Sequence, residues 1–445
     1  MHPLLPIGFR RLGRLAVLCC LLLSVWHAPA ARADSDDSEG AASPTPGLGV
    51  FQNDGDVGTV LHPGAAHFDA AHGTYTVTGS GENMWFGEDD FHYVWTKVSG
   101  DVALTADIAF VGDRGNPHRK AVLMIRQSLD GGSKAVDIAQ HGNGLTSLQF
   151  RATDGGPSHE IRSNIAAPQT VRIEKRGDLF YAFISGSDGK LHPTGASTKL
   201  ALTGPFYIGI GVSAHDKDAT ETALFSHVKL TPLSPTTGKP VLYSTLETVT
   251  IASTDRRAAY IAPGDLESPT WARDGKTIAF TARRDDATDG YTIPVSSGPV
   301  TPQKMPSEAV RKFPSVISTA KPEISPDGQY IYFSTERSGH AQIWRSDPNG
   351  NAVERFLVSD TNDWFPHVSP DGKWLVFLSY PSTVAGHPAN QDAVLNLMSL
   401  EDRRVHVLAT LLGGEGTINL PSWSPDSSQL AFISYELLAP GDCTQ

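Results

Sequence analysis

One short pattern recurs four times in the C-terminal half of this 445-residue chain. With Φ for an apolar residue it reads P-x-Φ-x-x-D-x-x-x-Φ-x-F, and its aspartates are Asp274, Asp327, Asp371 and Asp426. Successive aspartates are 53, 44 and 55 residues apart. Repeats of about 40–50 residues built from strands are typical of the four-stranded blades of a β-propeller. The pattern therefore predicts an all-β propeller over residues 241–438.

The aspartate of each repeat is expected in a tight turn. Ser325–Gly328 and Ser369–Gly372 both read Ser-Pro-Asp-Gly. In such a turn proline presets φ, aspartate bonds nearby backbone and glycine takes positive φ. We therefore predict that the recurrent aspartates are structural rather than catalytic.

Four blades can be recognised, and the last ends near Tyr435 without its outer strands. The segments 246–251 and 258–261 supply two spare strands before the first repeat, and we expect them to complete the last blade and close the ring. Residues 303–320 could be the remnant of a further blade but are too short for a full one. The ring is therefore either a small one of four blades or an incomplete one that packs on another surface. Third strands are expected at 291–295, 342–345 and 394–398, and fourth strands at 353–358 and 405–408.

Residues 48–230 follow a period of two, which indicates strands with one buried face. The run 102–110 alternates in this way, and 179–184 is apolar on both faces. Leu224, Ser226, Val228 and Leu230 are expected to share one face of the last strand. The many strands predict two packed antiparallel sheets, a β-sandwich or jelly roll. The Pro-rich stretch 231–240 is expected to be a linker.

The first 33 residues have the pattern of a secretory signal peptide. Arg10, Arg11 and Arg14 precede the apolar run 15–26, and Ala31–Ala33 provides small residues for cleavage. The run is shorter than the roughly 20 residues of a membrane span. We expect cleavage after Ala33, a periplasmic or secreted protein and no membrane insertion. Residues 34–47 are expected to form an acidic, disordered tether and 439–445 a short tail.

The composition excludes several classes of function. The net charge of −12 argues against nucleic acid, whose phosphates need a basic partner surface. The chain has no phosphate-binding glycine loop, no G-x-S-x-G elbow, no H-E-x-x-H helix and no cysteine cluster. We therefore expect no cofactor, and no catalytic residue can be assigned.

Two groups of residues are candidates for ligand binding in 48–230. Aromatic faces beside polar groups are what a sugar-binding groove needs, and Trp85, Asp89, His92 and Trp95 lie close together in sequence; packing in a sandwich core is the alternative. His62, His67 and His72 recur every five residues. This spacing does not align side chains on a strand, so surface loops are favoured over a metal site.

A further group is expected at one end of the propeller channel. The position four residues before each repeat aspartate is polar: Thr270, Glu323, His367 and Ser422. His387, Asn390, Asp392 and Asn419 fall on predicted loops that can reach the same end. His367, His387 and Asp392 could bind a ligand or a metal ion, and hydrogen bonding between blades is the alternative.

Residues 48–230 resemble concanavalin A-like sandwich domains. The resemblance rests on Asn83–Phe86, on Phe91–Trp95, on Gly100-Asp101 at the start of a strand and on 121–127 with Arg126. Members of this broad fold include glycan-binding domains and enzymes, so the resemblance implies a fold and leaves the function open.

The repeats over 241–438 resemble the propeller of the TolB family, whose blades carry S-P-D-G. Segments 362–367, 386–390 and 416–419 are similar to secreted TolB-like proteins with a sandwich domain in front. TolB works in the periplasm, where its propeller binds envelope proteins. Two departures are that the front domain here is a sandwich and that four blades are counted where six are usual.

Together these patterns predict an exported cell-envelope binding protein. The rim of its propeller and one face of its sandwich would bind a protein or a glycan. The alternative is a polysaccharide-active lyase or hydrolase with acid, base or metal groups at the channel mouth.

Overall fold

Strands account for all the regular secondary structure that can be described. The computed structural model describes residues 47–439 except 236, 285–286, 297 and 307–321, and no helix occurs among them. None of the described residues therefore forms a helix that is long and apolar enough to cross a membrane. The predicted signal peptide, the tether up to residue 46 and the tail from residue 440 lie outside the described residues.

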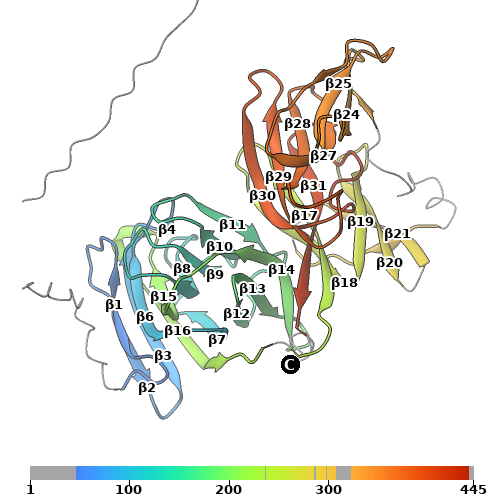
Figure 1. Ribbon diagram of the computed structural model, residues 1–445. Coiled ribbons are helices and arrows are strands. Elements are labelled where there is room, and N and C mark those ends of the chain that lie inside the picture. The colour runs from blue at the N-terminus through green and yellow to red at the C-terminus, as the bar shows by residue number, and fades with distance from the viewer. Residues whose placement is uncertain (1–46, 236, 285–286, 297, 307–321, 440–445) are drawn as a thin grey trace, which may run out of the picture. The chain divides into compact units, whose positions relative to one another are not determined.

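Two sheets pack against each other in the N-terminal region (Figure 1). Its strands are β1 Asn53–Val57, β2 Ala65–Asp69, β3 Thr74–Gly81, β4 Met84–Trp85, β5 Glu88–Asp89, β6 Phe91–Val98, β7 Val102–Phe110, β8 Lys120–Arg126, β9 Ala135–His141, β10 Thr146–Arg151, β11 Ser158–Arg162, β12 Thr170–Arg176, β13 Leu179–Ser185, β14 Leu191–Lys199, β15 Phe206–Ser213 and β16 Asp216–Pro232. The first sheet has the order β1-β6-β15-β8-β9-β10-β11, and the second has the order β14-β13-β12-β7-β16-β3-β2.

The core between these sheets is built by the predicted alternation. Leu123 and Ile138 of the first sheet share one apolar cluster with Leu104 and Ile173 of the second. Strand β13 is buried on both faces, as its apolar run predicts: Phe180 contacts this core and the neighbouring Phe183 belongs to a different cluster.

Strand β16 corrects one expectation. Ala223 and Phe225 point into the core, whereas Leu224 is 37% exposed. His227 has a φ of 51°, and the pairing with β7 shifts between Ser226 and Lys229. A bulge of this kind adds a residue to one strand and reverses which face its side chains occupy. Only Val228 and Leu230, after the bulge, pack against the core as expected. The strand continues through Pro232, the second residue of the expected linker.

The C-terminal region consists of antiparallel sheets that follow one another along the chain. Its strands are β17 Val241–Thr250, β18 Arg256–Pro263, β19 Asp265–Trp271, β20 Thr277–Arg284, β21 Ala287–Pro294, β22 Gln303–Lys304, β23 Glu323–Ile324, β24 Ile331–Thr335, β25 Gln342–Ser346, β26 Glu354–Arg355, β27 Thr361–Val368, β28 Trp374–Pro381, β29 Gln391–Ser399, β30 Val405–Gly413 and β31 Gln429–Leu438. β19–β22 and β23–β26 each form a four-stranded sheet, and β27–β30 pair in chain order. The expected third strands are present as β21, β25 and β29, whereas the fourth strand β26 is shorter than predicted.

The strands that precede the first repeat pair with the last one, as predicted. β17 pairs with β31 along its whole length, and β18 pairs with β17. A single residue pair, Leu412 with Tyr435, joins β31 to β30, so these strands continue one long sheet. At the other end, β18 lies parallel to β11 over two residues.

The repeat aspartates are structural, as predicted. Asp371 Oδ1 accepts hydrogen bonds from the Ser369 hydroxyl at 2.6 Å and from the backbone N–H of Lys373 at 3.1 Å. Asp327 and Asp426 repeat this arrangement with their own serines and backbone groups. The next residue has positive φ in every repeat, which suits glycine in three of them; in the last repeat Ser427 has a φ of 62°.

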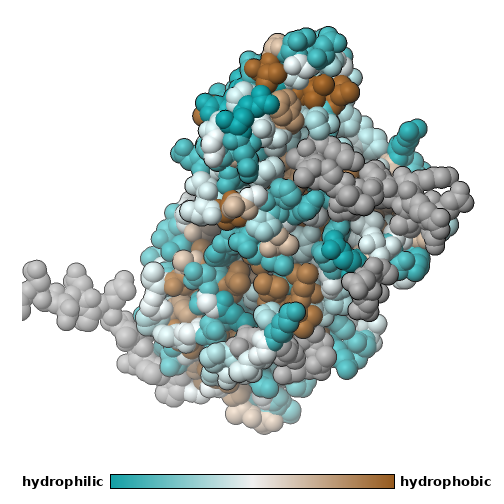
Figure 2. Space-filling view, turned by 45° about the vertical axis from the view of Figure 1, so that its right-hand side comes forward, coloured by the Kyte–Doolittle hydropathy of each residue, from teal (hydrophilic) through white to brown (hydrophobic). Residues whose placement is uncertain are grey.

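Polar and apolar groups alternate on the surface. On the face in Figure 2, hydrophobic residues form small groups among hydrophilic ones. Among the described residues, the large apolar side chains with the greatest exposure are Phe86 at 73% and Val358 at 66%.

Candidate functional site

The outer face of the first sheet, which is turned away from the core, carries polar residues at its centre. Side chains alternate between the two faces of a strand. Leu123 and Ile138 therefore point to the core, and Lys120 and Asp137 point outward from the same two strands. The register places Asp137, Gln149 and Glu160 in one row across β9, β10 and β11, and Lys120 opposite His141.

These side chains line a cavity of about 350 Å³, which we call the outer-face cavity. Its residues from the large sheet are Lys120, His141, Gln149, Glu160 and Arg162. Trp85 of the short strand β4 and the loop residues Asn83, His118, Leu145, His215 and Asp255 complete the lining. Asp137 lies next to it, in a much smaller cavity that also contacts Gln149. The cavity is thus polar although its sheet residues are mostly buried.

Several hydrogen-bonding atoms here have no protein partner within the described residues. They are Asp137 Oδ1, His141 Nδ1, Gln149 Oε1 and His215 Nδ1. The Gln149 amide nitrogen lies 3.2 Å from His141 Nε2. When the amide donates this bond, a neutral His141 carries its proton on Nδ1. The site then holds a buried donor, His141 Nδ1–H, and a buried acceptor, Gln149 Oε1. Unpartnered buried polar atoms are rare and costly, so such a pair points to a ligand or water.

The charges of the site are shifted by burial. Burial raises the pKa of Asp137 and lowers the pKa of Lys120, and the attraction between the two groups opposes both shifts. Burial, with a smaller contribution from Lys120, holds the pKa of His141 far below its usual range, so His141 is neutral at physiological pH. Shifted titratable groups that gather in one cavity are typical of functional sites.

Trp85 is positioned over this face by the short hairpin β4–β5. The Lys120 ammonium donates to the carbonyl of Met84 at 2.7 Å and to Asn83 Oδ1 at 3.1 Å. The same ammonium lies 5.3 Å from the centre of the Trp85 ring, within range of a cation–π contact. Lys120 therefore fixes the hairpin and the aromatic ring at the edge of the cavity.

A buried ion pair supports the other end of the hairpin. Arg151 donates to both carboxylate oxygens of Asp89, at 2.6 and 2.8 Å, and the two side chains are 2% and 5% exposed. Arg126 adds a second cation 3.6 Å from Asp89. Asp89 is thus occupied by protein groups, and its role in this geometry is to anchor the hairpin that carries Trp85.

The four residues expected to form an aromatic groove are separated by the structure. Trp85 lines the outer-face cavity. Trp95 is buried in an apolar cluster with Tyr93, which stacks on it at 5.6 Å. His92 bonds Asp56 at 2.7 Å and Asp54 at 3.3 Å. His92 points to the opposite face of β6 from Trp95, so it lies apart from the outer-face cavity.

The expected channel-mouth group contains one close pair. His367 Nδ1 lies 2.5 Å from Glu323 Oε2, and His367 Nε2 lies 2.6 Å from the carbonyl of Ile418. Glu323 also accepts from the backbone N–H of Val368. Glu323 and His367 hold equivalent positions in successive repeats, so these contacts are hydrogen bonds between repeats. They correspond to the alternative in the sequence analysis, in which these residues bond to each other rather than to a ligand.

The other members of that group lie elsewhere. His387 packs edge-on against Trp364 and Phe365, with ring centres 4.9 and 5.0 Å apart. Asp392 is in β29 rather than on a loop, and it forms an ion pair with Lys199 at 2.5 Å. Asn390 and Asn419 each keep a side-chain oxygen without a protein partner in the described part of the chain.

No metal site is assembled from these residues. In the ranges that can be described, no three His, Cys, Asp or Glu side chains form a group that could hold a metal ion. His67 is in β2, and His72 forms an exposed ion pair with Asp69 at 2.6 Å.

Apart from Trp85, the residues of the outer-face cavity were missed by sequence reasoning. Lys120 begins the apolar run of β8, Asp137 and Gln149 each stand between two apolar residues of their strands, and only the register brings the three together. A charged residue within an apolar run is unusual unless it is paired, and this signal could have marked Lys120 and Asp137.

Successive four-stranded antiparallel sheets, each with an S-P-D or related turn, define a propeller-type repeat protein. Residues 228–400 match the family model of the TolB beta propeller domain, PD40. This part, which is less than half of the chain, is therefore similar to the TolB propeller domain.

Individual proteins give weaker similarities. Uncharacterized protein Atu1656 of Agrobacterium fabrum is 39% identical over 165 residues, which are 37% of this chain and 53% of that protein. The match thus spans about half of that relative's length. The structure of putative TolB from Agrobacterium tumefaciens aligns over 77% of this chain and 100% of its own, with 23% identity and a TM-score of 0.26. Carbohydrate binding module CBM66 from Bacillus subtilis aligns over 42% of this chain and 99% of its own, with 16% identity and a TM-score of 0.29. TM-scores this low establish no common arrangement of the whole chains.

Proposed function

We propose that this protein is an exported binding protein of a bacterial envelope and that its outer-face cavity binds a glycan. The observation that carries the proposal is the pair of buried, unpartnered groups on His141 and Gln149. A sugar hydroxyl can accept from one and donate to the other. Because a buried polar atom without a partner is costly, a ligand that satisfies both gains free energy that an apolar ligand cannot.

Two further features support a glycan. Trp85 offers an aromatic face at the edge of the cavity, and the CH faces of sugars stack on such rings. Glu160 and Arg162 add charged hydrogen-bonding groups on the next strand, where they bond to each other at 2.5 Å. A cavity of about 350 Å³ is at the small end of ligand sites, which suits one or two sugar units at the end of a longer chain.

The proposal extends to the domains. We take 48–230 as a concanavalin A-like sandwich, 231–240 as a linker and 241–438 as a four-bladed propeller closed by the strands that precede its first repeat. The signal peptide over 1–33 would export the protein, and the propeller rim would contact an envelope protein. The TolB family match of 228–400 supports the propeller and an envelope role.

The geometry favours binding over the polysaccharide-active alternative. That alternative needs a free acid or base at His367, His387 or Asp392. Both ring nitrogens of His367 face protein acceptors, and Asp392 is paired with Lys199. His387 packs against Trp364 and Phe365, so each of the three groups already contacts other groups of the fold, which supports binding over catalysis.

A glycan array followed by calorimetry tests the proposal. We expect the purified protein to retain a defined glycan and Gln149→Leu to weaken that binding by about tenfold or more, because one buried hydrogen bond is lost. Gln329→Leu removes the side-chain amide of an exposed turn residue and is the matched control. Retention of no glycan by the unmodified protein, or equal affinity of Gln149→Leu and the control, would contradict the proposal.

A further inference from the structure

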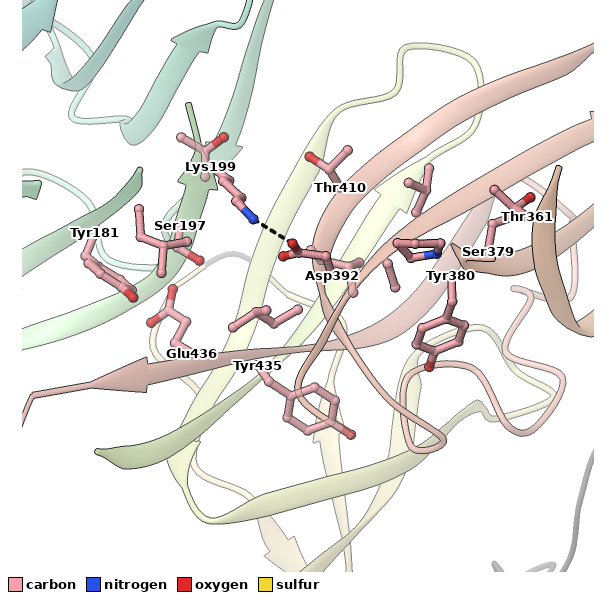
Figure 3. A pocket seen from close by; sticks show the side chains of 17 residues that line it. Tyr181, Ser197, Lys199, Thr361, Ser379, Tyr380, Asp392, Thr410, Tyr435 and Glu436 are labelled. Carbon is pink, nitrogen blue, oxygen red and sulfur yellow. Dashed lines mark hydrogen bonds and ion pairs between the residues drawn. The ribbon is translucent and has the colours of Figure 1, made fainter. Parts of the chain in front are cut away.

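A second cavity, of about 360 Å³, lies among strands β13, β14 and β27–β31. These strands belong to one compact unit of the chain. Apolar side chains supply much of the lining, among them Leu179, Val394, Leu411 and Leu412. Figure 3 shows Lys199 and Asp392 meeting across this cavity, and both side chains are more than half exposed. We call it the Glu436 cavity after its most unusual residue.

Glu436 is a buried carboxyl group in this apolar setting. Its side chain is 2% exposed, and its Oε1 has no hydrogen-bond partner within the described residues. The hydroxyl of Tyr380, which also lines the cavity, is buried and has no partner there either. Cavities that are mostly apolar with a few convergent polar groups are typical of small-molecule sites.

The groups around Glu436 leave its charge uncompensated. Glu247 on β17 is held by Arg256 at 2.9 and 3.0 Å and accepts from Ser434, so Arg256 is committed to that carboxylate. Tyr243 is opposite Glu436 in the register of β17 and β31. Ser197 on β14 forms a hydrogen bond with the Glu436 carboxyl group. Lys199, which could have supplied a positive charge, is paired with Asp392.

The titration of Glu436 is consistent with this environment. Burial raises the pKa of Glu436 to about 7, the hydrogen bond from Ser197 opposes the rise, and the charge of Glu247 adds to it. Near neutral pH the group therefore changes between a neutral acid and a buried anion, and the anion needs a cation beside it.

We propose that the Glu436 cavity binds a small apolar amine, whose hydrocarbon part lies against Leu179, Val394 and Leu411 and whose ammonium group pairs with the Glu436 carboxylate. A buried carboxylate with a free oxygen favours a donor that carries positive charge, since charge-assisted hydrogen bonds are the stronger ones. This site is independent of the outer-face cavity.

Calorimetry with three matched indole probes tests the proposal. Tryptamine, tryptophol and indolepropionate share one apolar body and differ in bearing an ammonium, a hydroxyl or a carboxylate group. At pH 8 we expect tryptamine to bind at least about tenfold more tightly than tryptophol, and indolepropionate to bind least. At pH 5, where Glu436 is protonated but the amine still charged, the preference for tryptamine should shrink to about twofold or less.

Two variants locate the effect. Glu436→Gln keeps the shape of the side chain and should abolish the preference at both pH values, whereas Glu401→Gln, an exposed control, should retain it. Thr410→Trp places a large ring at an exposed position of the lining and should weaken all probes together. The proposal is overturned if tryptamine and tryptophol bind equally at pH 8, if no probe binds, or if Glu436→Gln leaves the preference unchanged.

Discussion

The two halves of the molecule use their buried polar groups in opposite ways. In the C-terminal repeats, most of the recurrent polar residues are bonded within the fold, for example Ser369 to Asp371 and Glu323 to His367. On the outer face of the first N-terminal sheet, Gln149 and His141 keep atoms without protein partners in the described region. Most polar groups at the repeated positions are thus structural, whereas this outer face keeps polar atoms available to a ligand.

The physical reason lies in what each region must do. A repeat buries little by itself, so most of the hydrogen bonds in its turns and in its contacts with the next repeat have to be satisfied. Recurrence in a sequence therefore marks stability. A binding face has no such requirement. Its unsatisfied polar groups lower the stability of the free protein, and a ligand that bonds to them removes this cost. Four predictions test this contrast, from the largest expected effect to the smallest.

The Asp89–Arg151 pair should show the largest effect, because it is a structural pair within the binding region. Arg151→Leu leaves the buried Asp89 carboxylate with only Arg126, 3.6 Å away. Breaking a buried pair in this way costs about 3–5 kcal/mol. Urea unfolding of the variant should show a loss of this size. The control is Arg404→Leu, whose pair with Asp402 is exposed and should cost less than about 1 kcal/mol. Equal losses in the two variants would show that burial does not decide the effect.

Glu436 should make the stability of the protein depend on pH. Its pKa is about 7 in the folded state and near 4.5 in the unfolded chain. Between these values the unfolded state loses the proton first, so the free energy of unfolding falls as pH rises, and this contribution levels off above pH 7. The total fall should be about 3 kcal/mol. In Glu436→Gln the fall should be absent, and thermal unfolding from pH 4 to pH 8 measures the difference. A variant that keeps the full pH dependence would assign it to another group.

Glu436 also shows why a repeat is informative. Ten residues after the repeat aspartates, where Glu436 stands in the last repeat, Arg337 and Pro381 occupy the second and third. The first repeat has Arg284 there, so the position is acidic only in the last repeat, and the Glu436 side chain has an atom without a partner in the described chain. Glu436 is therefore available to a ligand, like Gln149 and His141, although it lies in the repeat region.

The sequence predicts those parts of the fold that depend on local patterns. Alternation over 102–110 and the turn chemistry around Asp371 require only neighbouring residues, and both expectations are confirmed. The pairing of β17 with β31 was predictable because an unfinished last repeat and spare first strands complete each other.

The candidate site could not be predicted in the same way. Lys120, Gln149 and Trp85 are adjacent because of strand register and the placement of one hairpin, and neither follows from local pattern. The bulge at His227 shows the same limit, because one extra residue reverses the exposed face of a strand that alternates regularly in sequence.

The contact between successive repeats should show an intermediate effect. Glu323→Ala removes the partner of His367 and the acceptor of the Val368 N–H, so buried donors are left unsatisfied at a cost of about 2 kcal/mol. Thr270 is the equivalent residue of the first repeat, and its hydroxyl is buried without a partner in the described structure. Thr270→Ala should therefore be neutral within about 0.5 kcal/mol. Denaturant unfolding of both variants makes the comparison, and a cost for Thr270→Ala equal to that of Glu323→Ala would refute it.

The smallest expected effect concerns the turn serine. Ser369 bonds Asp371 and accepts from the N–H of Trp374, so Ser369→Ala should cost about 1 kcal/mol. The first repeat has Ala272 at the same position, and its backbone bonds match those of Ser369: each residue's N–H donates to the residue five further on, and each carbonyl accepts from the turn glycine. Ala272→Ser should consequently gain about 0.5–1 kcal/mol, because the hydroxyl enters a turn already shaped for it and reaches Asp274. Thermal unfolding of the two variants should give shifts of opposite sign, and a destabilised Ala272→Ser would show that the turns of the first and third repeats are not equivalent.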